Sequence, residues 1–128
     1  MDLNEYQTLA SVTVAPLPSI EQEAFHAVAG LVGEVGEYAD VLKKEYIYGG
    51  INPYLVQDAR EELGDILWYV ALAASIHGLS LEEVAQKNIE KLKRRYPGKF
   101  TPEWAALRMD KLAETRGPKD AEAEKKDD

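Results

Sequence analysis

Two pairs of acidic residues are the part of this chain whose types and spacing suggest chemistry. Glu34 and Glu37 form an ExxE pair, and Glu62 and Asp65 form an ExxD pair. A spacing of three places both side chains of a pair on one face of a helix, about one turn apart. Two facing helices can therefore present four carboxylates to one shared volume. Oxygen ligands of this kind favour Mg²⁺, with Mn²⁺ as a substitute, over zinc or copper.

Spacing alone is weak evidence, because a chain with 23 Asp and Glu contains such pairs by chance. A solvated acidic face is the plain alternative. The ExxE pair, however, lies in a helical stretch that also carries Gly30, Gly33 and Gly36. Each glycine inside a helix costs about 0.5 to 1 kcal/mol relative to alanine. We therefore expect a neighbouring helix or a ligand to approach this stretch closely.

The ExxD pair borders the apolar side of its helix. A carboxylate beside a core costs several kcal/mol unless a cation neutralises it, so both pairs together call for positive charge. The chain has no Cys and two His, which excludes a thiolate zinc site. A di-iron bundle is disfavoured because it needs two Glu-x-x-His motifs and only the one from Glu23 to His26 is present.

A basic helix face supplies candidate phosphate ligands. In the helix expected from Ser80 to about Tyr96, Asn88 and Arg95 fall within the apolar stripe, and Lys87 and Lys91 flank it. Such a face can cradle phosphates. The alternative for the two lysines is ordinary pairing with neighbouring glutamates.

The elements that must position these residues are all helical, because no segment shows the alternation typical of a strand. Cap and breaker residues predict four helices over about 2–12, 20–44, 53–77 and 80–96, and a short fifth helix after Thr101-Pro102. The apolar stripe expected to pack the second helix into the core is Val28, Val32, Val35, Ala39 and Leu42. We expect one all-α domain over residues 1–113 and a charged, disordered tail over 114–128.

The composition of the chain limits the classes of partner that it can bind. The chain has 128 residues and a formal net charge of −8, which argues against binding to nucleic-acid polymers or to anionic membranes. The N-terminal residues do not resemble a secretion signal, and no apolar run is long enough to span a membrane. We expect a cytoplasmic protein.

The joint pattern resembles a known family. The segments GLVGEVGE (30–37), ELGDILWY (62–69) and NIEKLKRRYP (88–97) are similar to those of the MazG-type all-α nucleoside triphosphate pyrophosphohydrolases, in the superfamily that includes the dimeric dUTPases. The resemblance covers about residues 4–100. It implies that Glu34, Glu37, Glu62 and Asp65 bind Mg²⁺ and that Asn88 and Lys91 contact the substrate.

The resemblance also implies a reaction and an assembly. The products would be a nucleoside monophosphate and pyrophosphate, and the enzyme would be a homodimer or a tetramer built from dimers. Some relatives carry an acidic residue where this chain has Gly33, which leaves Glu34 and Glu37 as the candidates to activate water, with Glu61 behind them. The preferred substrates would be deoxy or noncanonical nucleotides. The alternative is an inactive nucleotide-binding or regulatory helical module.

Residues for base selection are less defined. His26, Tyr46 and Tyr48 are candidates to lie against a base, with ordinary packing as the alternative. Trp68 falls opposite the apolar stripe of its own helix. We therefore expect a partner subunit to cover it.

Overall fold

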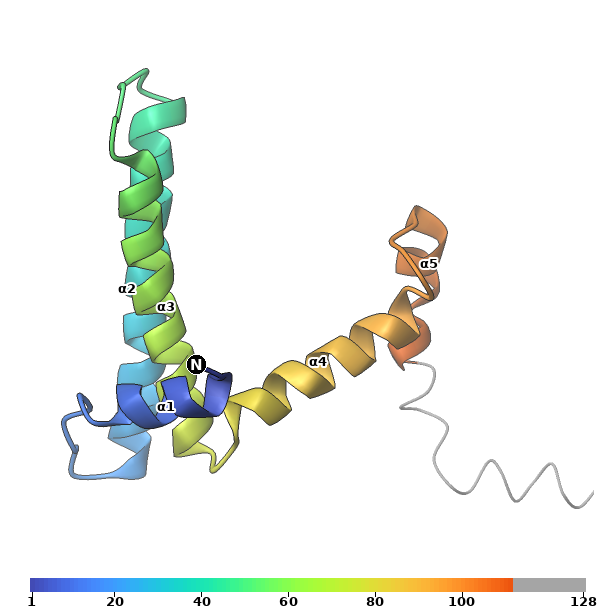
Figure 1. Cartoon of the computed structure of the whole chain (residues 1–128), viewed down its shortest axis with the longest axis horizontal. Coiled ribbons are helices and arrows are strands. Elements are labelled where there is room, and N and C mark those ends of the chain that lie inside the picture. The colour runs from blue at the N-terminus through green and yellow to red at the C-terminus, as the bar shows by residue number, and fades with distance from the viewer. Residues whose placement is uncertain (112–128) are drawn as a thin grey trace, which may run out of the picture. The chain divides into compact units, whose positions relative to one another are not determined.

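The computed structural model describes residues 1–111, which form five α-helices (Figure 1). The helices are α1 (Leu3–Ser11), α2 (Ile20–Tyr46), α3 (Leu55–Ile76), α4 (Leu81–Arg95) and α5 (Pro102–Leu107). The all-α prediction is confirmed, and the described part of the chain has no strand. The tail predicted over 114–128 lies outside the described residues. No single helix within residues 1–111 is long and apolar enough to cross a membrane.

Local capping explains where the helices begin and end. The Ser19 hydroxyl accepts a hydrogen bond from the Gln22 N–H, and the Ser80 hydroxyl accepts one from the Glu83 N–H, each at 3.3 Å. Gly78 follows α3 with a φ of +65°, a conformation that favours glycine. The predicted start of α3 at Pro53 is wrong by two residues, because the side chain of Asn52 accepts the Tyr54 N–H and holds a turn there.

The core lies where α1, α3 and the start of α4 meet. Ala71, Ala74 and Leu81 are buried, and Leu3 and Tyr6 of α1 pack against them. The longer helices α2 and α3 run side by side (Figure 1). Their contact positions the acidic pairs, since each helix carries one of them.

The face of α2 that packs against α3 differs from the one predicted. Val28, Val32 and Val35 of the expected core stripe are 60%, 68% and 49% exposed. Ala27 is instead buried, and Gly30 contacts the ring of Tyr69 on α3. Small residues allow the two helices to approach closely, so the valines are left on the outer face of the pair.

The chain divides into two compact units, Met1–Val84 and the part from Ala85 onward. In the second unit, the Arg95 guanidinium donates two hydrogen bonds to the buried Asp110 carboxylate, at 2.8 and 2.6 Å. This bidentate pair fixes the segment after α5 to the end of α4. The single domain over residues 1–113 stays a prediction.

Candidate metal and nucleotide site

Three of the four predicted carboxylates converge between α2 and α3. Glu34, Glu62 and Asp65 each offer one oxygen, and these oxygens all lie within 4.8 Å of one another. The helices that carry them are antiparallel neighbours joined by the 47–54 loop. One turn from the cluster, Tyr69 of α3 lies against Gly30 of α2. Tyr69 comes four residues after Asp65, and Gly30 comes four residues before Glu34. This contact sets the register that brings the acids together.

The cluster concentrates negative charge. Burial, followed by the charges of Glu37, Asp65 and Glu62, raises the pKa of Glu34. Burial and the charges of Glu37 and Asp65 likewise raise the pKa of Glu62. Within residues 1–111 the three clustered acids have no ion pair. Three mutually repelling carboxylate oxygens form a donor set that fits a hard divalent cation such as Mg²⁺.

Glu37 lies outside this set of three. It lines an adjacent groove of about 350 Å³ together with Gly33, Gly36, Asp40, Val41, Lys44 and Glu62. A Cβ atom added at Gly33 or Gly36 would meet nothing within 4 Å. Packing within the described chain therefore accounts for Gly30 but not for these two glycines, which leave the groove beside the cluster open.

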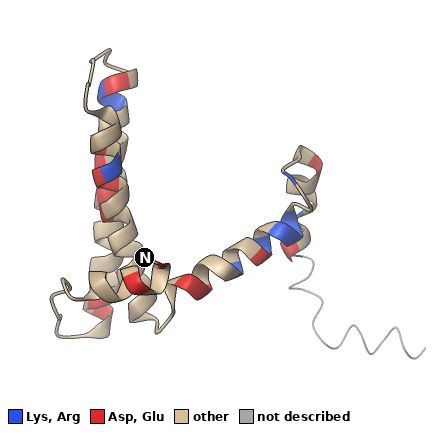
Figure 2. Ribbon diagram, viewed as in Figure 1, with Lys and Arg blue, Asp and Glu red and all other residues tan. Residues whose placement is uncertain are grey.

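The predicted phosphate ligands all lie on α4. Figure 2 marks Lys and Arg positions in blue along the C-terminal half of this helix. Lys87 is exposed and lies 3.5 Å from Glu90, so the ordinary pairing considered for it is present. Asn88 is exposed, and Lys91 is half-buried without an ion pair among residues 1–111. Because the cluster belongs to the first unit and these residues to the second, their convergence on one ligand stays a prediction.

Arg95 has a partner that sequence reasoning missed. Its two hydrogen bonds to Asp110 hold the pKa of that carboxyl far below its usual range and raise the pKa of the guanidinium. The sequence predicts that an Arg within an apolar stripe needs an acidic partner, but nothing in it identifies Asp110 as that partner.

Tyr69 also escaped the sequence analysis. Its ring has edge contacts with His26, at 5.7 Å between centroids, and with Trp68, at 4.9 Å. The Trp68 indole N–H donates to the Thr13 hydroxyl at 2.8 Å. The segment after α1 thus covers part of Trp68, and the expectation that a partner subunit covers this residue stays a prediction. Tyr46 and Tyr48 are 70% exposed.

The chain is thus an all-helical protein in which the ExxE helix and the ExxD helix bring three carboxylates into one cluster that could hold a metal ion. The model of one family, the MazG nucleotide pyrophosphohydrolase domain, matches residues 22–100, which include every residue predicted for the site. The chain therefore belongs to the MazG nucleotide pyrophosphohydrolase family, whose members act on phosphoanhydride bonds of nucleotides.

Two relatives show how far the similarity extends. Gene 37 protein of Mycobacterium phage L5 is 36% identical over 104 residues, which cover 74% of this chain and 89% of the relative. The uncharacterized protein YvdC of Bacillus subtilis strain 168 is 32% identical over 84 residues, which cover 59% of this chain and 78% of the relative. No solved structure matches the chain significantly.

Proposed function

We propose that this protein hydrolyses nucleoside triphosphates, deoxy or noncanonical ones in particular, to a nucleoside monophosphate and pyrophosphate. Water attacks the α-phosphorus, and Mg²⁺ is the cofactor, with Mn²⁺ as a substitute. The observation that carries the proposal is the cluster of Glu34, Glu62 and Asp65, three carboxylates that no Lys or Arg of residues 1–111 pairs with, in a chain of the MazG family.

The acidic residues have two roles in this proposal, to bind the metal ion and to activate the attacking water. Glu34, Glu62 and Asp65 hold the cation, which when bound neutralises the charge of the triphosphate and makes phosphorus more electrophilic. Glu37 lines the open groove beside Glu62, where its carboxylate orients a water and accepts its proton, with Glu34 as the other candidate for this role.

The α4 residues act on the phosphates in this proposal. Asn88 and Lys91 bind the triphosphate, and Lys87 and Lys91 stabilise the charge that develops on the leaving pyrophosphate. Arg95 completes the set only if its pair with Asp110 opens or is shared, because that pair engages two of its N–H groups.

We also propose a homodimer or a tetramer in the cytoplasm. The exposed faces of Val28, Val32 and Val35 form an apolar strip on α2 that a second copy would bury. Sedimentation of the purified protein tests this. A monomer at all concentrations would contradict it.

Product analysis tests the activity. The protein is incubated with Mg²⁺ and a panel of ribo-, deoxy- and modified triphosphates, and the products are separated by ion-exchange chromatography. We expect monophosphate and pyrophosphate, and we expect Glu62→Gln to abolish them while Glu82→Gln, at an exposed glutamate of α4 outside the predicted site, retains them. Diphosphate and phosphate would reject attack at the α-phosphorus. No product from any triphosphate would favour an inactive binding module.

A further inference from the structure

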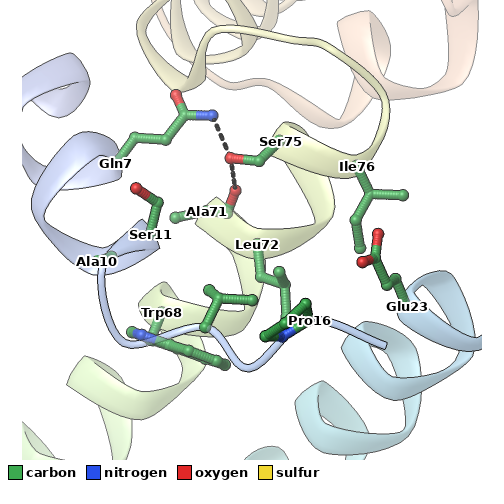
Figure 3. Close-up of a pocket in the computed structure, with 11 residues that line it drawn as sticks. Gln7, Ala10, Ser11, Pro16, Glu23, Trp68, Ala71, Leu72, Ser75 and Ile76 are labelled. Atoms are coloured by element: carbon green, nitrogen blue, oxygen red, sulfur yellow. Dashed lines mark hydrogen bonds between the residues drawn. The ribbon is translucent and has the colours of Figure 1, made fainter. Parts of the chain in front are cut away.

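A cavity of about 300 Å³ lies in the first unit beyond the Tyr69 contact (Figure 3). Its volume is at the small end of the range for small-molecule sites, about 300 to 1,000 Å³. The apolar part of its lining is Ala10, Val14, Pro16, Trp68, Ala71, Leu72 and Ile76. Trp68 follows Asp65 of the carboxylate cluster by three residues, less than one helical turn. One edge of the cavity is therefore close to the cluster, on the same helix.

The side-chain hydrogen-bond donors that line the cavity all donate to acceptors within the protein. These bonds run from Gln7 Nε2 to Ser75 Oγ (2.9 Å) and to the Leu79 carbonyl (2.9 Å), from Ser75 Oγ to the Ala71 carbonyl (3.0 Å), from Ser11 Oγ to the Thr8 carbonyl (2.7 Å), and from Trp68 Nε1 to Thr13 Oγ1 (2.8 Å). Figure 3 shows the Gln7–Ser75–Ala71 part of this network at the cavity wall. A ligand thus finds no free side-chain N–H or O–H among the lining residues.

Glu23 is the exception among these polar side chains. It enters the cavity from the first turns of α2 and lies beside Ile76, across the view from Trp68 (Figure 3). Its carboxylate is half-buried and has no hydrogen bond or ion pair within residues 1–111. An ionised carboxylate only accepts hydrogen bonds. The cavity therefore combines apolar walls with a strong acceptor and selects for a ligand that brings its own N–H donors.

We infer that this cavity receives the base of the substrate and that Glu23 selects bases with an exocyclic amino group, an inference that rests on the proposed function. A flat apolar body fits walls that include an indole, and cytosine, adenine and guanine each direct amino N–H donors at an acceptor. Uracil and thymine present carbonyl oxygens on both sides of their one ring N–H. These carbonyl oxygens would be repelled by the Glu23 carboxylate, and the side chains that line the cavity offer them no hydrogen-bond donor.

Binding is measured first without turnover. The chain has two tryptophans, and Trp104 lies in the second unit, so the indole N–H signal of Trp68 in a ¹⁵N-labelled sample has an internal reference. Deoxycytidine, deoxyadenosine and deoxyguanosine are titrated without metal against thymidine. We expect the three amino nucleosides to shift the Trp68 signal at lower concentration than thymidine, with Trp104 unmoved. Equal shifts by all four, or no shift by any, would overturn the inference.

The substrate panel then tests selection during turnover. We expect kcat/KM for dCTP, dATP and dGTP to exceed that for dTTP and dUTP by about tenfold, the effect of one good base contact. Glu23→Gln should reduce this ratio toward one, because an amide also donates to a carbonyl. Glu21→Gln removes the same charge from the same helical turn outside the cavity and should leave the ratio unchanged.

The outcomes separate the two claims. Hydrolysis of all five triphosphates at one rate, or an equal loss for all five in Glu23→Gln, would overturn base selection and leave the proposed function standing. No hydrolysis of any triphosphate would remove the proposed function, and the nucleoside titration alone would then decide whether the cavity selects amino bases.

Discussion

Replacing Gly30 by alanine tests the packing that sets the register of α2 against α3. A Cβ atom at this position would overlap the Tyr69 ring. The rings of His26 and Trp68 also contact the Tyr69 ring, which restricts its movement away from Gly30. Overpacking of this kind costs about 1 to 3 kcal/mol. The helix gains about 0.5 to 1 kcal/mol from the loss of a glycine.

The two effects leave Gly30→Ala less stable by about 1.2 kcal/mol, taking about 2 for the strain and about 0.8 for the gain. In a domain of this size we expect the melting temperature to fall by about 5 °C. The assay is thermal unfolding followed by circular dichroism, with urea unfolding as a second measure of the free energy.

A second background makes the test decisive. In Tyr69→Ala the ring is absent, so the same Gly30→Ala change should stabilise the protein by about 0.8 kcal/mol. The sign of the effect therefore reverses between the two backgrounds. A Gly30→Ala protein that is as stable as the wild type in the presence of Tyr69, or a loss of the same size in both backgrounds, would refute the reasoning.

Two further predictions concern charge. Mg²⁺ at ten times its dissociation constant should stabilise the protein by about 1.4 kcal/mol, and Glu34→Gln or Asp65→Asn should reduce this. Because the folded-state pKa values of Glu34 and Glu62 are raised, the contribution of these two acids to stability is present in acid and is lost as the pH rises through those values. The rise in melting temperature with Mg²⁺ should therefore be larger at pH 7 than at pH 5. An equal rise at both values would contradict this. Asp110→Asn should lower the melting temperature and speed hydrogen exchange in α5, and an unchanged melting temperature would mean that the pair with Arg95 is dispensable. Because the pKa of Asp110 is depressed, the stability that this residue adds is present at neutral pH and is lost only in strong acid.

The sequence was sufficient to predict the helices and much of the cluster. Ser19, Ser80 and Gly78 mark helix ends through local backbone chemistry that does not depend on the rest of the fold. Three of the four acidic residues lie together, as predicted. The spacing of three places Glu62 and Asp65 on one face of α3, and the antiparallel neighbour α2 brings Glu34 to that face.

The predictions that failed concern which surfaces meet. Periodicity identified the valine stripe of α2 as apolar, but it does not say whether an apolar face packs on its own chain or on another, and Val28 and Val32 are exposed. The actual contact uses Gly30, whose lack of a side chain gives no hydrophobic signal. Likewise, the partner of Arg95 comes from another element, and one helix read alone does not reveal it.

The central claim is that the carboxylate cluster holds a divalent cation that directs water to the α-phosphorus. The most direct test is hydrolysis of a triphosphate in H₂¹⁸O with Mg²⁺, read by ³¹P NMR of the products. We predict that the label enters the nucleoside monophosphate and that chelation of the metal stops the reaction. Label in pyrophosphate, or unchanged hydrolysis in the presence of the chelator, would contradict the claim.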